Sequence, residues 1–278
     1  MTRIGAVGFL NARPLYEGLD RDPGIVLRYD VPAVCAQLLH AGAIDVGLVP
    51  VIELLRGPVA YEVVPGLAIA CDGPVNSVAL FTRRPIGDVR RIALDVSSRS
   101  SVGLVRVLCR HHFRIEPEFV DAAPDLGAML DAADAALLIG DPALRASADA
   151  LGAVKIDLGE AWKAFTGLPF VFAVWAARPG ALGPGGVARL HAARRAGDVA
   201  IPVIAAAEAA GDREEAVRLA QYLRRNIRYD LDDEAVRGLA RYLTLAMEDG
   251  LAPHRPDVLQ VIEDLVPQPA GDEPTRRP

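Results

Sequence analysis

Short apolar runs alternate along this chain with segments of helical periodicity, and no other feature restricts the fold as strongly. Buried strands are predicted at residues 4–10, 25–29, 43–49, 92–96, 135–139 and 170–176. Short helices at 14–19 and 32–40 separate the first three runs. Each begins with a proline, which suits the first helical position because the N–H there has no partner within the helix. Alternation of this kind predicts an α/β protein with parallel sheets.

The pattern also divides the 278 residues into two domains. Two extended runs, 63–70 and 75–82, follow the first α/β unit, and we expect the second run to cross between domains. Another α/β unit extends to about residue 170, where strand 170–176 leads back. Beyond Pro179 we predict only helices, at 187–196, 200–209, 214–226, 234–247 and 257–265. The expected domains are 1–82 with 177–278, and an inserted domain of 83–176, with 271–278 as a loose tail.

Charge and composition exclude several classes of partner. Thirty basic and 36 acidic residues give a net charge of −6, whereas domains that bind nucleic acid concentrate positive charge. No apolar segment reaches the roughly 18 residues of a membrane span, and the run at 4–10 is too short for a secretory signal. Three cysteines without a C-x-x-C pair fit a reducing compartment. We expect a cytoplasmic, soluble protein without nucleic-acid or membrane partners, and the sequence leaves open whether it forms a homodimer.

Polar residues that directly follow predicted strands are candidates for a ligand site, because ligands of open α/β sheets lie beyond the carboxyl ends of the strands. Asn11 follows the first strand, and its amide can donate to and accept from a carboxylate or hydroxyl. Its alternative role is to cap the next helix. Ser100 and Ser101 belong to a serine-rich segment, 97–101, that follows the strand at 92–96. A helix N-terminus with serine hydroxyls would bind an anion, although one serine suffices as a cap.

Further candidates lie at the same predicted edge. Gly140 and Asp141 form another strand-to-helix junction, where Asp141 either caps the helix or faces the cleft. Ser77 lies in the expected crossing strand, and Thr166 and Gly167 form a corner before the last strand. We expect these residues to complete the wall of one cleft.

The sequence contains no metal, nucleotide or nucleophile signature. The patterns G-x-S-x-G, G-x-G-x-x-G and the phosphate-binding P-loop do not occur. His111 and His112 are consecutive, so on a helix they point about 100° apart and cannot bind one ion together. The remaining histidines have no acidic or cysteine companion nearby in the sequence. We therefore expect neither a metal site nor a cofactor.

Six segments together give a family resemblance. They read F-L-N-A-R-P-L (9–15), A-I-D-V-G-L-V-P (43–50), G-P-V-N-S-V (73–78), S-S-R-S-S-V (97–102), I-G-D (139–141) and G-E-A-W-K-A-F-T-G-L-P-F-V-F-A-V-W (159–175). In these segments the chain resembles the chorismate dehydratases of the futalosine route to menaquinone. The likeness extends to about residue 265, and the domain arrangement resembles the two-lobed periplasmic-binding-protein fold of type II. The sister enzyme of that route uses a cleft histidine, and no histidine follows a strand end here.

The resemblance implies a reaction and a set of roles. Chorismate, a dicarboxylate, would lose water to give 3-[(1-carboxyvinyl)oxy]benzoate without metal or organic cofactor. The serines and Thr166–Gly167 would hold carboxylates, and Asn11 would contact the departing hydroxyl or the enolpyruvyl group. The base is left open among Asp141, Glu160 and the substrate's own carboxylate. The alternatives are a solute-binding protein without catalysis, which needs export, and the sensor domain of a transcription regulator, which needs a DNA-reading helix pair.

Overall fold

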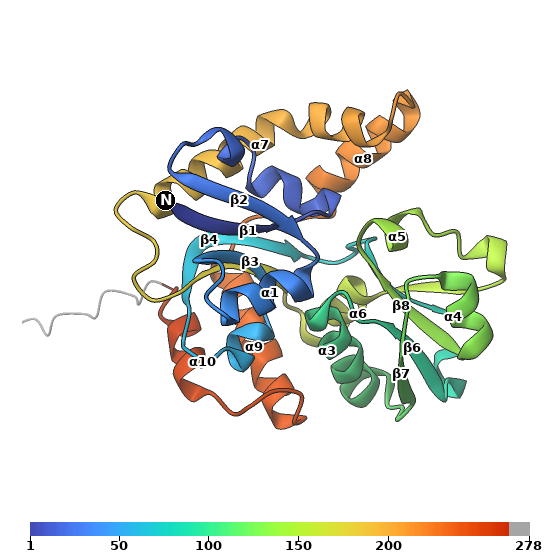
Figure 1. Cartoon of the computed structure of the whole chain (residues 1–278). Coiled ribbons are helices and arrows are strands. Elements are labelled where there is room, and N and C mark those ends of the chain that lie inside the picture. The colour runs from blue at the N-terminus through green and yellow to red at the C-terminus, as the bar shows by residue number, and fades with distance from the viewer. Residues whose placement is uncertain (267–278) are drawn as a thin grey trace, which may run out of the picture.

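The computed structural model describes residues 1–266, which form two α/β lobes, each built on a five-stranded sheet (Figure 1). The tail predicted for 271–278 lies outside the described residues. The two lobes lie side by side in Figure 1, with the N-terminal half of the first lobe in blue and the second lobe largely in green. The two-lobed α/β architecture predicted from the sequence is confirmed.

The sheet of the first lobe has the strand order β2-β1-β3-β10-β4. Strand β1 is parallel to β2 and β3, as the alternation predicts, but β10 runs antiparallel to both β3 and β4. The prediction of wholly parallel sheets is therefore wrong for this returning strand. The strands of this lobe are β1 (Thr2–Val7), β2 (Ile25–Asp30), β3 (Val46–Pro50), β4 (Glu62–Cys71) and β10 (Phe170–Ala177).

The sheet of the second lobe has the order β7-β6-β8-β5-β9, in which β5 is antiparallel to β8 and β9. The sequence analysis missed the two edge strands, β7 and β9. Both are partly exposed, so they lack the continuous apolar run that marks a buried strand. The strands are β5 (Val78–Thr82), β6 (Arg91–Asp95), β7 (Glu118–Ala122), β8 (Ala135–Ile139) and β9 (Val154–Asp157).

The chain does not cross between the lobes at the expected domain boundaries, 82/83 and 176/177, as the membership of the strands in the two sheets shows. Strand β5, expected to belong to the first domain, pairs within the second sheet, and β10 pairs within the first. The chain thus changes lobes between Cys71 and Val78, and again between α6 (Leu158–Thr166) and β10. Both strands are fully buried, and apart from Thr82 at the end of β5 they are apolar, so their sequences do not show which sheet they join.

Helices cover the faces of both sheets. Beyond β10 the described chain is helical, as predicted, but the two helices expected at 187–196 and 200–209 are one, α7, which runs through Pro202. The helix expected at 14–19 is instead a 3-10 helix, Leu10–Leu15. The helices are α1 (Pro32–His40), α2 (Glu53–Arg56), α3 (Arg99–Leu108), α4 (Leu126–Ala132), α5 (Gly140–Arg145), α6 (Leu158–Thr166), α7 (Gly186–Glu208), α8 (Arg213–Arg225), α9 (Asp233–Glu248) and α10 (Pro256–Glu263).

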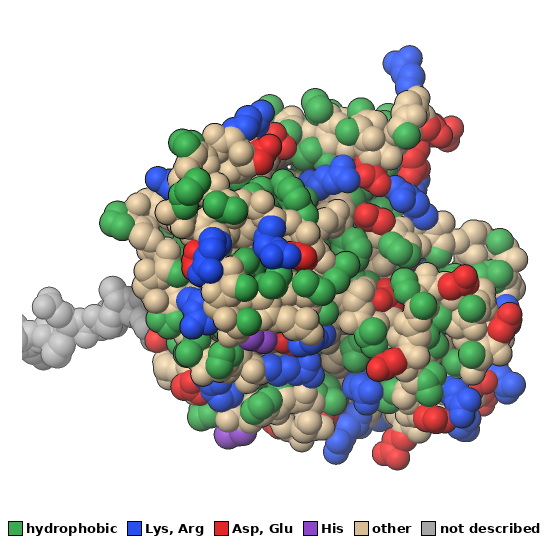
Figure 2. All heavy atoms as spheres, viewed as in Figure 1, with side chains coloured by type: hydrophobic (Ala, Val, Ile, Leu, Met, Phe, Trp, Pro, Cys, Tyr) green, Lys and Arg blue, Asp and Glu red, His purple; other side chains and the backbone are tan. Residues whose placement is uncertain are grey.

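An aromatic cluster fixes the return from the second lobe to the first. The ring of Phe170 packs edge-on against Trp162 and Tyr242, with centroid distances of 5.2 and 4.9 Å. The indole N–H of Trp162 donates to the carbonyl of Pro169 at 3.1 Å, so this buried polar group is satisfied. The cluster thus joins α6, β10 and α9. On the outside, Figure 2 shows acidic and basic side chains interspersed over the face in view.

Candidate functional site

A hollow between the two lobes lies where the sequence analysis expected a ligand, at the carboxyl ends of β1, β3, β6 and β8. Its lining is mostly apolar, with polar groups from Asn11 and two serines. The antiparallel strands β5 and β10 reach the same edge with their amino-terminal halves. The lining residues of this interlobe hollow are Val7, Phe9, Asn11, Pro32, Pro50, Ile69, Val78, Ser98, Ser101, Ile139, Gly140, Phe172 and Ala173.

The N-terminus of α3 supplies the serine hydroxyls of the interlobe hollow. Ser98 is the N-cap of this ten-residue helix, and its hydroxyl accepts from the backbone N–H of Ser101 at 3.4 Å. The hydroxyls of Ser98 and Ser101 lie 3.0 Å apart. Ser101 lines the interlobe hollow as predicted, and Ser98, from the same serine-rich segment, does so as well. Hydroxyls at a helix N-terminus suit an anionic or strongly polar ligand.

Gly140 brings the second lobe against the aromatic ring of the first. It has a φ of +62°, and a Cβ added there would lie 3.2 Å from three atoms of the Phe9 ring. Only glycine combines this left-handed backbone with such a close approach. The prediction that Gly140 faces the cleft is thereby supported by geometry, and Phe9 is the group that it faces.

Asn11 does not cap a helix, although the sequence left that role open. It lies inside the 3-10 helix Leu10–Leu15, which has no side-chain cap. Its Oδ1 is buried without a hydrogen-bond partner among residues 1–266, and so is the hydroxyl oxygen of Ser77. The backbone carbonyl of Asn11 accepts a hydrogen bond of 2.9 Å from the Tyr229 hydroxyl, which fixes the main chain but leaves the amide free.

Asp141 holds the lobes together next to Asn11. Its Oδ1 accepts from the backbone N–H of Leu10 at 3.3 Å, so α5 of the second lobe is tied to the 3-10 helix of the first. Burial raises the pKa of Asp141 above its ordinary value, and the Leu10 hydrogen bond only partly opposes this effect. The carboxyl group is therefore more basic than an exposed aspartate. It does not cap α5, whose N-cap is Ile139 without a side-chain bond.

An ion-pair bridge lies beside this contact. Glu208, at the end of α7, pairs with Arg13 of its own lobe at 2.8 Å and also with Arg145 of the second lobe. Both arginines and Glu208 act on the pKa of Asp141, so the bridge lies close to the interlobe hollow. Arg13, two residues after Asn11, is thus engaged in an ion pair.

Ser100 lies at a second contact between the lobes and does not line the interlobe hollow. Its hydroxyl accepts from the backbone N–H of Ile52 at 3.3 Å, and its carbonyl accepts from Tyr242 at 3.0 Å. Beside it, Arg99 pairs with the buried Glu53 at 2.9 Å. Burial raises the pKa of Glu53, but His40, Arg99 and Arg56 outweigh this effect and lower it.

The corner of Thr166 and Gly167 lies away from the interlobe hollow. The Thr166 hydroxyl donates to the carbonyl of Trp162 at 2.9 Å and accepts from the N–H of Leu168 at 3.1 Å. Gly167 ends α6 in the left-handed conformation, with a φ of +72°. Both residues shape the turn into β10, and neither is brought to the other candidates. Glu160 is exposed on the first turn of α6.

The interlobe hollow is narrow in this conformation. It leaves about 40 Å³ of free space, enough for a few waters, whereas sites for small organic molecules enclose roughly 300–1,000 Å³. Contacts on both flanks, from Asp141 to Leu10 and from Ser100 to Ile52, keep the lobes together. A ligand of the size of chorismate therefore requires the lobes to separate.

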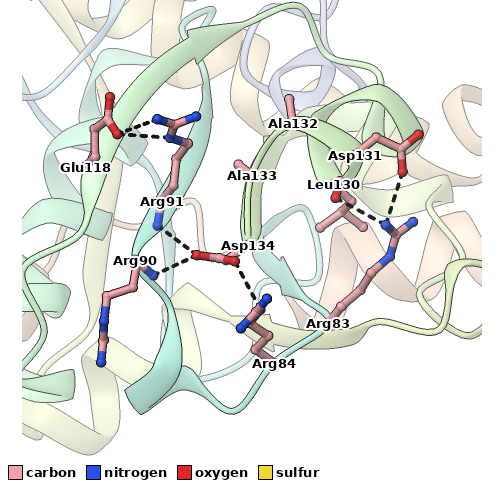
Figure 3. A pocket seen from close by; sticks show the side chains of 10 residues that line it. All are labelled: Arg83, Arg84, Arg90, Arg91, Glu118, Leu130, Asp131, Ala132, Ala133 and Asp134. Atoms are coloured by element: carbon pink, nitrogen blue, oxygen red, sulfur yellow. Dashed lines mark hydrogen bonds and ion pairs between the residues drawn. The ribbon is translucent and has the colours of Figure 1, made fainter.

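A larger groove in the second lobe is lined by arginines but does not have the properties of this site (Figure 3). It lies at the amino ends of β6 and β8, opposite the serines. Three of its arginines pair with carboxylates that line the same groove: Arg83 with Asp131, Arg84 with Asp134, and Arg91 with Glu118. Asp134 also accepts the backbone N–H groups of residues 90 and 91. The charged groups of this groove are thus largely paired with one another.

Two histidines pair with carboxylates from other segments. His40 contacts Glu53 at 3.0 Å, and His111 contacts Asp249 at 3.0 Å, so both have acidic companions that the sequence analysis did not foresee. These carboxylates come from distant segments, which explains the error. Within residues 1–266, no group of three metal-binding side chains is close enough to hold an ion. No helix in that range is long and apolar enough to cross a membrane.

Several residues of the site were missed from the sequence. Phe9 and Phe172 have the signature of ordinary core residues. Ser98 carried a signal, since it is in the serine-rich segment. Glu53 and Glu208 gave none, because single acidic residues in helices usually face solvent.

Comparisons with known proteins identify the family of this chain. A family model described as menaquinone biosynthesis matches residues 2–248. The chorismate dehydratase of Thermus thermophilus is 32% identical over 259 residues, covering 86% of this chain and 93% of that protein.

Solved structures resemble the fold at low sequence identity. The alkanesulfonate-binding protein SsuA of Xanthomonas axonopodis, bound to MOPS, is 18% identical with a TM-score of 0.66, covering 96% of this chain and 98% of its own. The Candida albicans CA3427 product, described as having the generic periplasmic binding protein fold, is 13% identical with a TM-score of 0.63, covering 98% and 99%. The predicted periplasmic-binding-protein fold is thus confirmed. Because the family model matches most of this chain, the chain belongs to the menaquinone biosynthesis family.

Proposed function

We infer that this protein is a chorismate dehydratase, a hydro-lyase that converts chorismate to 3-[(1-carboxyvinyl)oxy]benzoate and water in menaquinone biosynthesis. The observation that carries the inference is the 32% identity to a chorismate dehydratase over nearly the whole chain. The interlobe hollow adds support from chemistry, because its apolar walls suit a ring and its few donors suit carboxylate and hydroxyl groups.

The reaction requires orientation and charge stabilisation more than a strong nucleophile. The proton on C3 of chorismate is vinylogous to the ring carboxylate, and the C4 hydroxyl leaves. Removal of that proton and departure of the hydroxyl as water produce an aromatic ring, which drives the step. Donors placed where negative charge develops, in a site that excludes water, lower the barrier of such a reaction. Separation and closure of the two lobes would admit the substrate and then exclude water.

Roles for individual residues follow from their positions. We propose that the amide of Asn11 binds the departing hydroxyl or the enolpyruvyl group, and that Ser101, with Ser98, binds a carboxylate at the N-terminus of α3. Gly140 and Ser77 would shape the opposite wall. Ser100, Thr166 and Gly167 have hydrogen bonds or positions that fit structural roles better.

Two candidates for the base are favoured over the third. Glu160 is exposed on α6 and does not line the interlobe hollow, so it is disfavoured. Asp141 has a raised pKa and lies beside Asn11, whereas the substrate's own side-chain carboxylate would need no protein base. The Asp141→Asn variant separates them, since removal of a general base costs about 10²- to 10⁴-fold in rate. Retained turnover would assign proton removal to the substrate.

The deciding experiment is incubation of the purified protein with chorismate alone, followed by detection of the aromatic enol ether. Its appearance without added metal or nucleotide supports the dehydratase. Saturable binding of chorismate without any product would instead support the second candidate, a small-carboxylate solute-binding protein, whose fold is shared by SsuA.

The proposed role of Asn11 has its own test. The Asn11→Ala variant should lose turnover while its melting temperature stays close to that of the wild type, because its Oδ1 has no hydrogen-bond partner among the described residues. Asn226→Ala is the matched control, since that amide binds the Pro74 carbonyl outside the site. A large loss of stability in Asn11→Ala with normal activity in the folded fraction would contradict the catalytic role. We also propose that the protein acts in the cytoplasm on a small dicarboxylate, without a nucleic-acid partner.

A further inference from the structure

Among residues 1–266, two buried oxygen atoms near the site have no hydrogen bond, one in the first lobe and one in the segment that crosses into the second. Asn11 Oδ1 belongs to the 3-10 helix of the first lobe, and the Ser77 hydroxyl lies just before β5 of the second. Leaving a buried polar atom unsatisfied costs about 1–3 kcal/mol. Such atoms are rare in folded proteins, and each needs an explanation.

The end of α8 lies against both segments. Asn226, which caps this helix, donates to the carbonyl of Pro74 at 2.9 Å, just ahead of Ser77. Tyr229, three residues further on, donates to the carbonyl of Asn11. Tyr222 lies one helical turn before Asn226, which donates its backbone N–H to the Tyr222 carbonyl. The last turn of α8, which carries Tyr222, therefore lies beside the segments that carry Asn11 and Ser77.

The Tyr222 hydroxyl is a protonated donor at this place. Tyr222 is only 4% exposed. Burial raises the pKa of its hydroxyl, and the side chains of Ser77 and Asn11 lower it in part, so both lie within reach of the phenol oxygen. Neither Asn11 Oδ1 nor the Ser77 hydroxyl has a well-aligned hydrogen bond in this conformation. The terminal torsion of asparagine is broad, so the Asn11 amide can turn its oxygen toward the phenol and accept a hydrogen bond from it.

We propose that Tyr222 is a positioning residue, whose hydroxyl donates to Asn11 Oδ1 and accepts from Ser77, and thereby turns the Asn11 amide nitrogen toward the substrate. One chain of hydrogen bonds then satisfies both unpaired oxygens. An asparagine donates only through its nitrogen, so a substrate with two carboxylates and a leaving hydroxyl needs that nitrogen in the interlobe hollow. The proposal rests on the dehydratase function inferred above.

The test compares Tyr222→Phe with Tyr61→Phe, which removes another buried tyrosine hydroxyl, one bonded to His40. We expect kcat for chorismate dehydration to fall by about 10- to 100-fold in Tyr222→Phe, while KM changes by less than about threefold, because a misplaced donor acts mainly in the transition state. Tyr61→Phe should keep wild-type kcat. An unchanged kcat in Tyr222→Phe overturns the proposal.

A double-mutant cycle with Asn11 distinguishes positioning from a general packing effect. In the Asn11→Ala background, measured in single turnovers with enzyme in excess, Tyr222→Phe should cost less than about twofold, because the group that it positions is gone. An equal loss in both backgrounds would show that Tyr222 acts independently of Asn11. If Tyr222→Phe is poorly folded, 3-fluorotyrosine at position 222 keeps the packing and changes the donor strength, and kcat should change with it.

A readout without turnover separates this proposal from the function itself. The side-chain amide resonances of Asn11, assigned by their loss in Asn11→Ala, should shift in Tyr222→Phe and not in Tyr61→Phe. Failure of the wild-type protein to dehydrate chorismate would refute the function, whereas unshifted amide resonances would refute the positioning role alone.

Discussion

Gly140 and Gly152 offer a matched pair that tests how the second lobe forms the interlobe hollow. Both have left-handed backbones, with φ of +62° and +59°. An added Cβ at Gly140 would lie 3.2 Å from three atoms of the Phe9 ring, whereas one at Gly152 would meet nothing within 4 Å. Substitution by alanine therefore adds the same backbone strain at both positions, and a steric contact at only one.

The expected magnitudes follow from these two terms. A left-handed alanine costs roughly 1–2 kcal/mol, so Gly152→Ala should destabilise the protein by about 1 kcal/mol. Overpacking adds about 1–3 kcal/mol in a rigid core. Phe9 is only partly buried and can move, so we expect about 2 kcal/mol in total for Gly140→Ala. At roughly 2–4 °C per kcal/mol, the melting temperatures should fall by about 3 °C and 6 °C.

Activity should separate the two variants more sharply than stability. A methyl group at position 140, or the Phe9 ring that it displaces, would take up much of the roughly 40 Å³ of the hollow. We expect kcat/KM for chorismate to fall by about 10- to 100-fold in Gly140→Ala and to stay within about twofold in Gly152→Ala. Thermal unfolding and steady-state kinetics measure both effects. Equal losses of activity in the two variants would refute the assignment of this wall to the site.

Three further predictions concern the contacts around the site. Glu208→Gln weakens the ion-pair bridge from Arg13 to Arg145, so KM should rise by about fivefold, or about 1 kcal/mol, with little change in kcat. The control is Glu215→Gln, which removes an ion pair within α8 and should leave kcat and KM unchanged. Because the folded pKa of Glu53 is depressed, its stabilising effect is complete above about pH 4.5 and disappears as the pH falls through the folded pKa. The unfolding free energy of Glu53→Gln should therefore vary less with pH in that range. Burial raises the pKa of the thiols of Cys35, Cys71 and Cys109. A thiol reagent should therefore modify these cysteines only after the protein has unfolded.

Local signals in the sequence predicted the parts of the fold that depend on local interactions. Strands that are buried on both faces, such as β3 and β8, show as apolar runs, and acidic caps mark the starts of α8 and α9. Sheet membership is not local, because an apolar strand is equally stable in either sheet. The assignments of β5 and β10 therefore differed from the structure. Edge strands are half exposed, so β7 and β9 lacked any apolar run.

The candidate site divides along the same line. Asn11, Ser101 and Gly140 were found because they directly follow strands, and the carboxyl ends of parallel strands must meet at one edge. Thr166 and Gly167 follow a helix, so the same rule did not apply to them, and the structure places them at a turn. Ser100 is next to Ser101, which lines the interlobe hollow, but consecutive helical side chains point about 100° apart, and the Ser100 hydroxyl accepts from the Ile52 N–H instead.

Residues that act through other residues lie beyond the reach of such rules. Tyr222 has the spacing of a core position on an amphipathic helix, with Leu219 and Leu223 buried beside it. Only the three-dimensional structure shows that its hydroxyl lies beside two unpaired oxygens from segments far apart in the sequence. Tyr222 and Asn11 both belong to the first lobe, so a hydrogen bond between them can persist when the lobes separate. Ser77 lies in the segment that crosses into the second lobe, so the complete chain of hydrogen bonds would depend on closure, and the Asn11 amide would be held most firmly once water has been excluded from the substrate.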